Sequence, residues 1–157
     1  GIAAEFGPYR VSVHSGSDKF SVYRIVGEET NHHLHLKTSG TSWLEALRVL
    51  AKHEPELYRR IHAFVLDYYP EALRAYHISA DFSAVPSITS MQDAELPSLL
   101  DHPDARQMLH ISYGGVLGNP ELRLALYAAL WEHEDAYASG LAAHFRRHLE
   151  PLLGGGS

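Results

Sequence analysis

The chain has 157 residues, of which 45% are hydrophobic, and its formal net charge is −6 with histidine neutral. This length suffices for a domain with a real core, and the negative charge argues against a nucleic-acid partner, because phosphate binding needs a basic face. There is no cysteine, which excludes disulfides and thiolate ligands. No run approaches the roughly 18 apolar residues of a membrane span, and no signal peptide opens the chain. We therefore expect a cytoplasmic protein without a membrane partner.

Hydrophobic periodicity and turn residues predict alternating strands and helices. In chain order we expect a strand over 9–14, a helix over 18–26, a strand over 33–37, helices over 43–53 and 55–69, a helical stub over 71–74, a strand over 75–80, a loop over 82–90, helices over 91–100 and 103–108, a strand over 109–113, and a helix over 120–149 broken at Gly140. The S-x-x-E sequence that begins at Ser42 is typical of a capping box.

This alternation predicts an α/β fold with parallel βα units. Four strands are half of the eight in a TIM (β/α)8-type barrel. We therefore expect about four βα units, forming a half-barrel domain over residues 1–153, and a flexible tail over 154–157. Four units cannot close such a barrel, and open sheet edges invite pairing. A homo-oligomer or a complementary half-barrel is the expected partner.

The four predicted strands share a pattern in which one histidine is flanked by apolar residues. His14, His35, His77 and His110 have the same phase in VSVHSG, HLHLKT, AYHISAD and LHISYG. In a barrel, the apolar phase would face the surrounding helices and the polar phase would face the axis. Four imidazoles would then converge near the C-terminal ends of the strands, where barrel enzymes bind their ligands.

Converging imidazoles predict a metal site, because imidazole is the commonest metal ligand in proteins. His14 and His35 are the predicted ligands, since polar loop residues follow both at once, and His110 is the next candidate. A single inward-facing histidine is more often a hydrogen-bonded core residue, and that alternative stands for each of them. Five further histidines lie in predicted helices and are expected at the surface: His53, His62, His133, His144 and His148.

Two loops between a strand and a helix are candidate anion sites. Backbone N–H groups at such positions bind carboxylate or phosphate. The candidate substrate-binding residues in and beside these loops are Ser15, Ser17, Lys19, Lys37 and Thr38. Lys37 has the phase of His35, and a lysine on a barrel axis needs a partner or a function. The alternative is that the loop hydroxyls only cap helices.

Four segments resemble the tagaturonate epimerase family: PYRVSVHSGSDKFSVY, HLKTSGTSWLEALRVLA, YHISAD and ARQMLHISYG. The resemblance implies a metal-dependent TIM-barrel enzyme that interconverts the sugar acids D-tagaturonate and D-fructuronate. It also implies a divalent ion (zinc, iron, manganese, nickel or cobalt) held partly by His14 and His35. The family has SVYP where this chain has Ser21-Val22-Tyr23-Arg24, so the helix after the first loop is expected to differ.

Members of this family are much longer than 157 residues, and the resemblance places this chain in their C-terminal part. The catalytic acid and base are therefore unknown, with Asp18 and His77 as the candidates within the chain. Three functions remain open: part of a sugar-acid epimerase, a non-catalytic half-barrel module, or another metal-dependent sugar isomerase of barrel fold.

Overall fold

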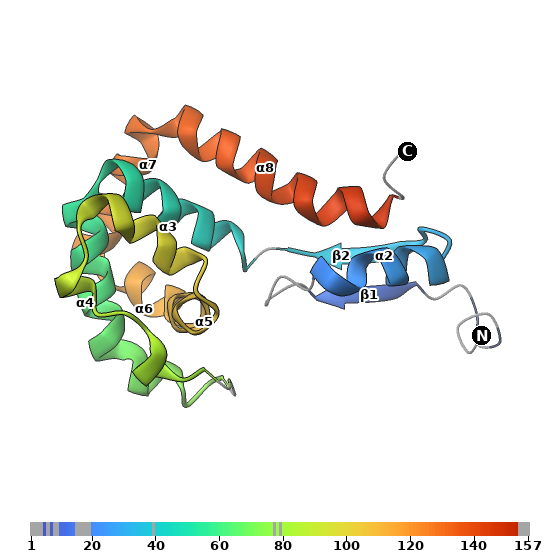
Figure 1. The fold of residues 1–157 in the computed structure, drawn as a ribbon, viewed down its shortest axis with the longest axis horizontal. Helices are drawn as coiled ribbons and strands as arrows, with labels where there is room; N and C mark the ends of the chain where they lie inside the picture. The colour runs from blue at the N-terminus through green and yellow to red at the C-terminus, as the bar shows by residue number, and fades with distance from the viewer. Residues whose placement is uncertain are drawn as a thin grey trace. The chain divides into compact units, whose positions relative to one another are not determined.

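The computed structural model describes residues 5, 7, 10–14, 20–38, 40–76, 78 and 80–153. It divides into two compact units. The strand unit is Gly1–Ser42 with Leu141–Ser157, and the helical unit is Trp43–Gly140. The elements are β1 (Val11–His14), α2 (Phe20–Glu29), β2 (Leu34–Lys37), α3 (Ser42–His53), α4 (Pro55–Ala72), the 3-10 segments η1 (Phe82–Ala84), η2 (Ile88–Ser90) and η3 (Asp93–Leu100), α5 (Pro103–Ile111), α6 (Tyr113–Gly118), α7 (Pro120–Glu132) and α8 (Glu134–Leu152) (Figure 1).

The strand unit contains a βαβ motif, as predicted. β1 and β2 pair in parallel, with Val11 opposite Leu34 and His14 opposite Lys37, and α2 provides the crossover that parallel strands require. The helix does not stop before Gly27 but continues to Glu29.

Gly27 permits a close approach of the end of α8 to α2. A Cβ atom there would lie 2.7 Å from the carbonyl oxygen of Leu152, so only glycine fits without a backbone shift. After α2, Asn31 and His32 have positive φ angles of 48° and 61°. This left-handed turn reverses the chain into β2, and the His32 side chain hydrogen-bonds to the Leu152 carbonyl.

The helical unit is built around one apolar core. Pro55 and Pro120 each start a helix, the position where a missing N–H group is harmless. Asn119 caps α7 by accepting hydrogen bonds from two backbone N–H groups. The fully buried large side chains of this unit come from α3, α4, α5, α7 and η3: Leu44, Leu47, Leu50, Tyr58, Ile61, Leu96, Leu99, Leu100, Met108, Leu109 and Leu126.

Arginine side chains from the helices hold the irregular segment before α5. Arg59 donates to the carbonyl oxygens of Ile88 and Met91 and pairs with Asp93. Arg48 donates to the Leu100 carbonyl at 3.1 Å. These bonds add to the backbone hydrogen bonds of the segment, since the Ile88 carbonyl also accepts from the Met91 N–H at 3.3 Å.

The predicted strand over 109–113 is wrong, because this segment completes α5 and begins α6. Leu109 and Ile111 are both buried, but they belong to a helical stripe with Ala105 and Met108. A short apolar run fits a buried helix as well as a strand. The indole N–H of Trp43 also donates to the Leu109 carbonyl at 2.9 Å, satisfying an acceptor near the end of α5.

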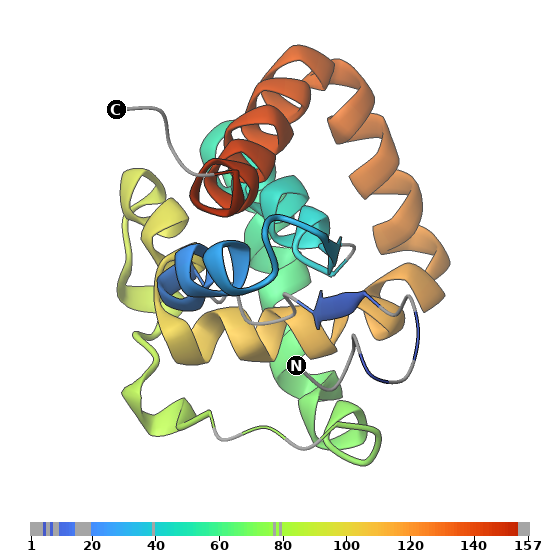
Figure 2. The same ribbon diagram turned by 90° about the vertical axis from the view of Figure 1, so that its right-hand side faces the viewer.

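Three other predicted elements differ from those in the structure. Ala75, Tyr76, Ile78 and Ala80, the described residues of the predicted strand over 75–80, are not in a strand. The predicted stub over 71–74 is the end of α4, which passes through Pro70 to Ala72. The helix over 120–149 breaks at His133 rather than Gly140, and α7 and α8 meet there at a bend (Figure 2).

Within the described ranges, no helix combines the length and the apolar character needed to cross a membrane.

Candidate functional site

The polar side chains of β1 and β2 project from one face of the strand pair. The register places Ser12 opposite His35 and His14 opposite Lys37, and residues two apart along a strand share a face. All four residues are exposed. The predicted common phase of His14, His35 and Lys37 is therefore confirmed, while their roles stay predictions.

The imidazole of His35 is oriented by its neighbour on β1. Its Nδ1 atom lies 3.0 Å from the Ser12 hydroxyl oxygen, a hydrogen-bonding distance. In the tautomer with its proton on Nδ1, the ring donates to Ser12 and presents the lone pair of Nε2. Metal-binding histidines are commonly held by an outer partner of this kind. The geometry of His35 therefore suits a metal ligand.

His14 and Lys37 end their strands side by side in the register. An imidazole beside a lysine side chain suits a site that takes a cation together with an anionic ligand. Among the residues that the structure describes, no group of three converging His, Asp or Glu side chains includes His14 or His35. A metal ion at these two histidines would take its other ligands from further residues or water.

Five predicted site residues lie outside the described residues: Ser15, Ser17, Asp18, Lys19 and His77. Thr38 is described and is partly buried. Its carbonyl oxygen accepts from the backbone N–H of Thr41 at 3.0 Å and from the Thr41 hydroxyl at 2.9 Å. These bonds stabilise the turn into α3. Anion binding by this loop stays a prediction.

His110 lies in the last turn of α5, within the helical unit, and is half-buried. The prediction that it shares a strand phase with His14 and His35 is wrong. A helix turns by about 100° per residue, so the alternation of apolar and polar residues around His110 does not predict the direction of its side chain.

A buried polar stripe on α8 was missed by sequence reasoning. The buried residues of this helix are His144, His148 and Leu152, and the two histidines are only 3% and 0% exposed. The expectation that they lie at the surface is wrong. Their spacing of four places them on one helix face together with a leucine, and this pattern could have revealed their burial.

These two imidazoles connect three segments of the strand unit. His144 Nε2 lies 2.6 Å from the Thr41 hydroxyl and 2.9 Å from His148 Nε2. His148 Nδ1 lies 3.0 Å from the hydroxyl of Tyr23 on α2. Tyr23 and Thr41 are both fully buried. The network therefore ties α2 and the turn after β2 to α8.

One donor in this network is set by its second bond. The Thr41 hydroxyl donates to the Thr38 carbonyl, so its oxygen can accept from His144 in the tautomer that carries a proton on Nε2. The direction of the bonds from His148 to His144 and to Tyr23 depends on which ring nitrogens carry protons.

His62 on α4 is another histidine whose expected surface position is wrong. It is 1% exposed, and within the described structure neither ring nitrogen has a hydrogen-bond partner. Burial lowers the pKa of His62 to about 4, because desolvation disfavours the charged form. The ring lines a cavity of about 140 Å³ with Phe82, Ile88 and Met108.

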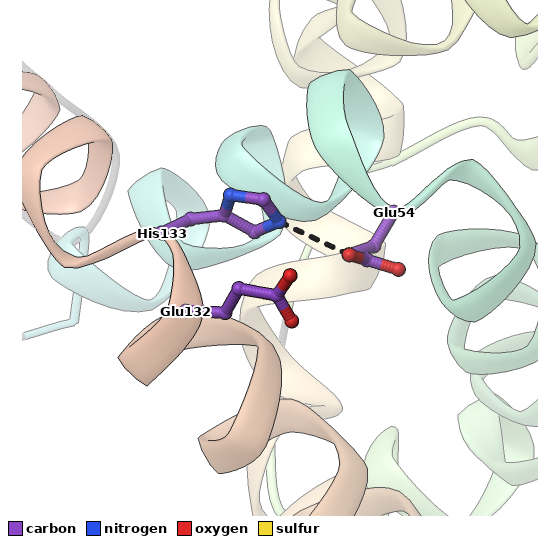
Figure 3. A group of neighbouring side chains, drawn as sticks. All are labelled: Glu54, Glu132 and His133. Carbon is purple, nitrogen blue, oxygen red and sulfur yellow. Dashed lines mark hydrogen bonds and ion pairs between the residues drawn. The ribbon is translucent and has the colours of Figure 1, made fainter.

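The structure does bring together one metal-type cluster, in the helical unit. Glu54, Glu132 and His133 each place a ligand atom within 4.8 Å of the others. Figure 3 shows the three side chains turned toward the same space. Sequence reasoning missed this cluster because Glu54 and His133 are 79 positions apart in the chain.

Comparison with known proteins identifies relatives over nearly the whole chain. The family described as UxaE, tagaturonate epimerase, matches residues 1–152. The chain is 42% identical over 153 residues to the tagaturonate/fructuronate epimerase of Thermotoga maritima, covering 98% of this chain and 32% of that protein.

Solved structures of a relative give the same result. The native crystal structure of the fructuronate-tagaturonate epimerase UxaE from Cohnella laeviribosi matches with a TM-score of 0.91 and 43% identity. A glycerol complex of that enzyme matches with a TM-score of 0.91 and 42% identity. Each match covers 96% of this chain and 32% of the crystallised chain. The chain therefore spans about a third of the length of these relatives.

Proposed function

The chain belongs to the tagaturonate epimerase family, a family of enzymes, and from this premise we propose that it is the C-terminal part of a metal-dependent sugar-acid epimerase. The proposed reaction is the interconversion of D-tagaturonate and D-fructuronate. The observation that carries the proposal is the family match over residues 1–152. Because the matched relatives are about three times longer, the activity is assigned to a protein that also contains their remaining segments.

The βαβ motif is assigned to a TIM-type barrel, within a domain over residues 1–153. In such barrels, ligands bind at the C-terminal ends of the strands. His14 and Lys37 are the last residues of β1 and β2. Their position supports a ligand site at this end of the strand pair.

A divalent ion, such as zinc, iron, manganese, nickel or cobalt, is assigned to His14 and His35. The shared polar face and the hydrogen bond between His35 and Ser12 support this assignment. Such an ion would stabilise negative charge that develops on substrate oxygens. His110 is not added to this set, since it lies on α5.

Lys37 is assigned to the carboxylate of the sugar acid, together with Ser15, Ser17, Lys19 and Thr38. The proximity of Lys37 to His14 in the register supports this role, because it would place the substrate carboxylate beside the metal ligands.

The proposed reaction inverts a hydroxyl-bearing carbon that is β to a ketone, so the proton on that carbon is not acidic. A base can instead remove the hydroxyl proton, and the adjacent carbon–carbon bond then breaks in a retro-aldol step. Rotation and re-addition restore this bond with inverted configuration, and an acid returns the proton. Asp18 and His77 are the candidates within this chain, and the other segments of the enzyme can also supply these groups.

A non-catalytic module is the second candidate function. The described strands form a sheet of only two, with order β1-β2, and such a sheet has two edges that can pair with other strands. This module would assemble with a second copy of itself or with a complementary half-barrel.

Reconstitution distinguishes these functions. The chain would be mixed with, or fused to, a segment that supplies the remaining two thirds of the relatives' length, and both keto-uronates would be followed by NMR. Interconversion supports the epimerase. Metal-loaded assembly without turnover would support the module, and turnover of only a neutral ketose would support a different isomerase.

Metal analysis tests the site itself. His14→Ala and His35→Ala should each lower bound metal in the reconstituted protein, whereas His33→Ala, an exposed histidine just before β2, should not. Lys37→Met should weaken binding of the sugar acid and leave the metal content unchanged. Equal metal content in all three histidine variants would refute the assignment.

A further inference from the structure

We propose that Glu54, Glu132 and His133 form a binding site for a divalent transition-metal ion in the helical unit. This inference does not depend on the proposed epimerase activity, because all three residues lie within Trp43–Gly140. No residue of the strand pair takes part in it.

The three ligands are positioned by two helix junctions. Glu54 lies between α3 and α4, and His133 lies between α7 and α8. Backbone hydrogen bonds fix both junctions. The Glu54 N–H donates to the Leu50 carbonyl (2.8 Å), and the Tyr58 N–H donates to the Glu54 carbonyl (3.0 Å). In the same way, the His133 N–H donates to the Ala129 carbonyl and the Tyr137 N–H donates to the His133 carbonyl (both 3.0 Å). Glu132 ends α7 directly before the break, so it approaches Glu54 together with His133 (Figure 3).

The distances suit a common ion. His133 Nε2 lies 3.0 Å from Glu54 Oε1, and two ligand atoms that each lie about 2.1 Å from one tetrahedral zinc ion are about 3.4 Å apart, so a small widening of this pair would admit the ion. The third ligand atom, from Glu132, is within 4.8 Å of both. Glu132 is exposed, so its side chain can close the remaining gap without disturbing the core.

The ligand set favours a transition metal over calcium or magnesium. One imidazole nitrogen and two carboxylates form a mixed nitrogen and oxygen set, which zinc, manganese, iron, cobalt and nickel accept. Calcium and magnesium prefer oxygen ligands alone. Three protein ligands would also leave positions for water.

The surroundings fix the imidazole and favour a cation. The ring of His53 stacks on that of His133, with centroids 4.7 Å apart and planes 25° apart. Residues 131–136 line an open depression at the junction of α7 and α8, and Glu132, Glu134 and Asp135 are among them. Carboxylates around a concave surface raise the local concentration of cations.

A plain ion pair between Glu54 and His133 is the competing explanation, and it gives Glu132 no role.

The test uses the 157-residue chain without an affinity tag, carrying His14→Ala and His35→Ala to remove the other proposed metal site. Zinc and cobalt(II) would be titrated by calorimetry, and cobalt(II) binding also by absorption. We expect one ion per chain at the triad.

Glu132→Gln is the decisive variant, since it retains the side-chain shape and the bond between Glu54 and His133. It should weaken zinc binding at least tenfold. Glu121→Gln is the matched control, because Glu121 is an exposed glutamate on the same helix whose partner is Arg60. Equal zinc affinity in the two variants, with both folded by urea titration, would overturn the proposal.

NMR of the chain with intact Glu132 gives a second measurement that needs no ligand variant. Cobalt(II) should shift or broaden the ring signals of His53 and His133 before those of His102, which lies elsewhere in the helical unit. Simultaneous broadening of all exposed histidines would also overturn the site.

Discussion

The interior of the strand unit and the interior of the helical unit are stabilised by different kinds of interaction. The described buried side chains of the strand unit are few and mostly polar: Tyr23, Thr41, His144, His148 and Leu152. The helical unit instead buries a continuous set of leucine, isoleucine, valine, methionine and tyrosine side chains from several helices. Hydrogen bonds contribute modestly, whereas buried apolar area is the dominant source of stability.

This difference shows which unit has an apolar core of its own. The helical unit has an apolar core of its own. The described residues of the strand unit include two strands and bury few apolar side chains, which agrees with the proposal that further segments of a longer enzyme complete its sheet. Substitutions in the two units should therefore differ in their effects on the free energy of unfolding.

The largest effect is expected from truncation in the helical core. Leu109→Ala removes a side chain that is 0% exposed, and it should lower the free energy of unfolding by about 3 kcal/mol, as cavity-forming substitutions do. Leu124→Ala is the control, because Leu124 is 67% exposed. Urea unfolding of both variants would measure the difference, and similar values would contradict the assignment of Leu109 to the core.

Acid should destabilise the helical unit through His62. The pKa of His62 is about 4 in the folded chain and is about 6.5 when unfolded. Between these values the unfolded state binds more protons, so stability falls as the pH falls, by about 3 kcal/mol at pH 4.

His62→Leu removes this titration and should flatten that part of the pH dependence. The comparison is between the free energies of unfolding of the two chains at pH 7.5, 5.5 and 4. A constant difference between them at all three pH values would show that His62 does not titrate as described.

Two adjacent glycines of α6 should respond in opposite directions. A Cβ atom at Gly115 would lie 2.4 Å from the Tyr68 ring, whereas one at Gly114 would meet nothing within 4 Å. Gly115→Ala should therefore cost about 2 kcal/mol through overpacking. Gly114→Ala should stabilise by about 0.5 kcal/mol, because alanine favours helix. Thermal unfolding of both variants provides the measurement, and the same sign for both would be inconsistent with this packing.

The smallest loss of stability is expected in the polar network of the strand unit. Tyr23→Phe removes the hydroxyl that partners His148 Nδ1 at 3.0 Å and should cost about 1 kcal/mol. Tyr127→Phe is the control, since Tyr127 is 55% exposed. Hydrogen exchange in α2 would report the loss locally, and unchanged exchange would show that the network does not hold this helix.

Much of the local structure followed from the sequence alone. Alternation predicted β1 and β2 and the common face of His14, His35 and Lys37, because strand geometry fixes side-chain direction within a few residues. The periodicity of α3 and the proline at the start of α4 predicted those helices in the same way. The four motifs also identified the family, since they require only the order of residues.

Tertiary structure decided what local patterns leave open. The segment over 109–113 fits a strand or a helix by pattern, and the packing of α5 against α4 and η3 selected the helix. His62, His144 and His148 are buried, because each lies on the helix face that meets another element. The Glu54, Glu132 and His133 cluster depends on two helix junctions far apart in the chain. Periodicity describes one element at a time, whereas burial and ligand convergence depend on which elements pack together.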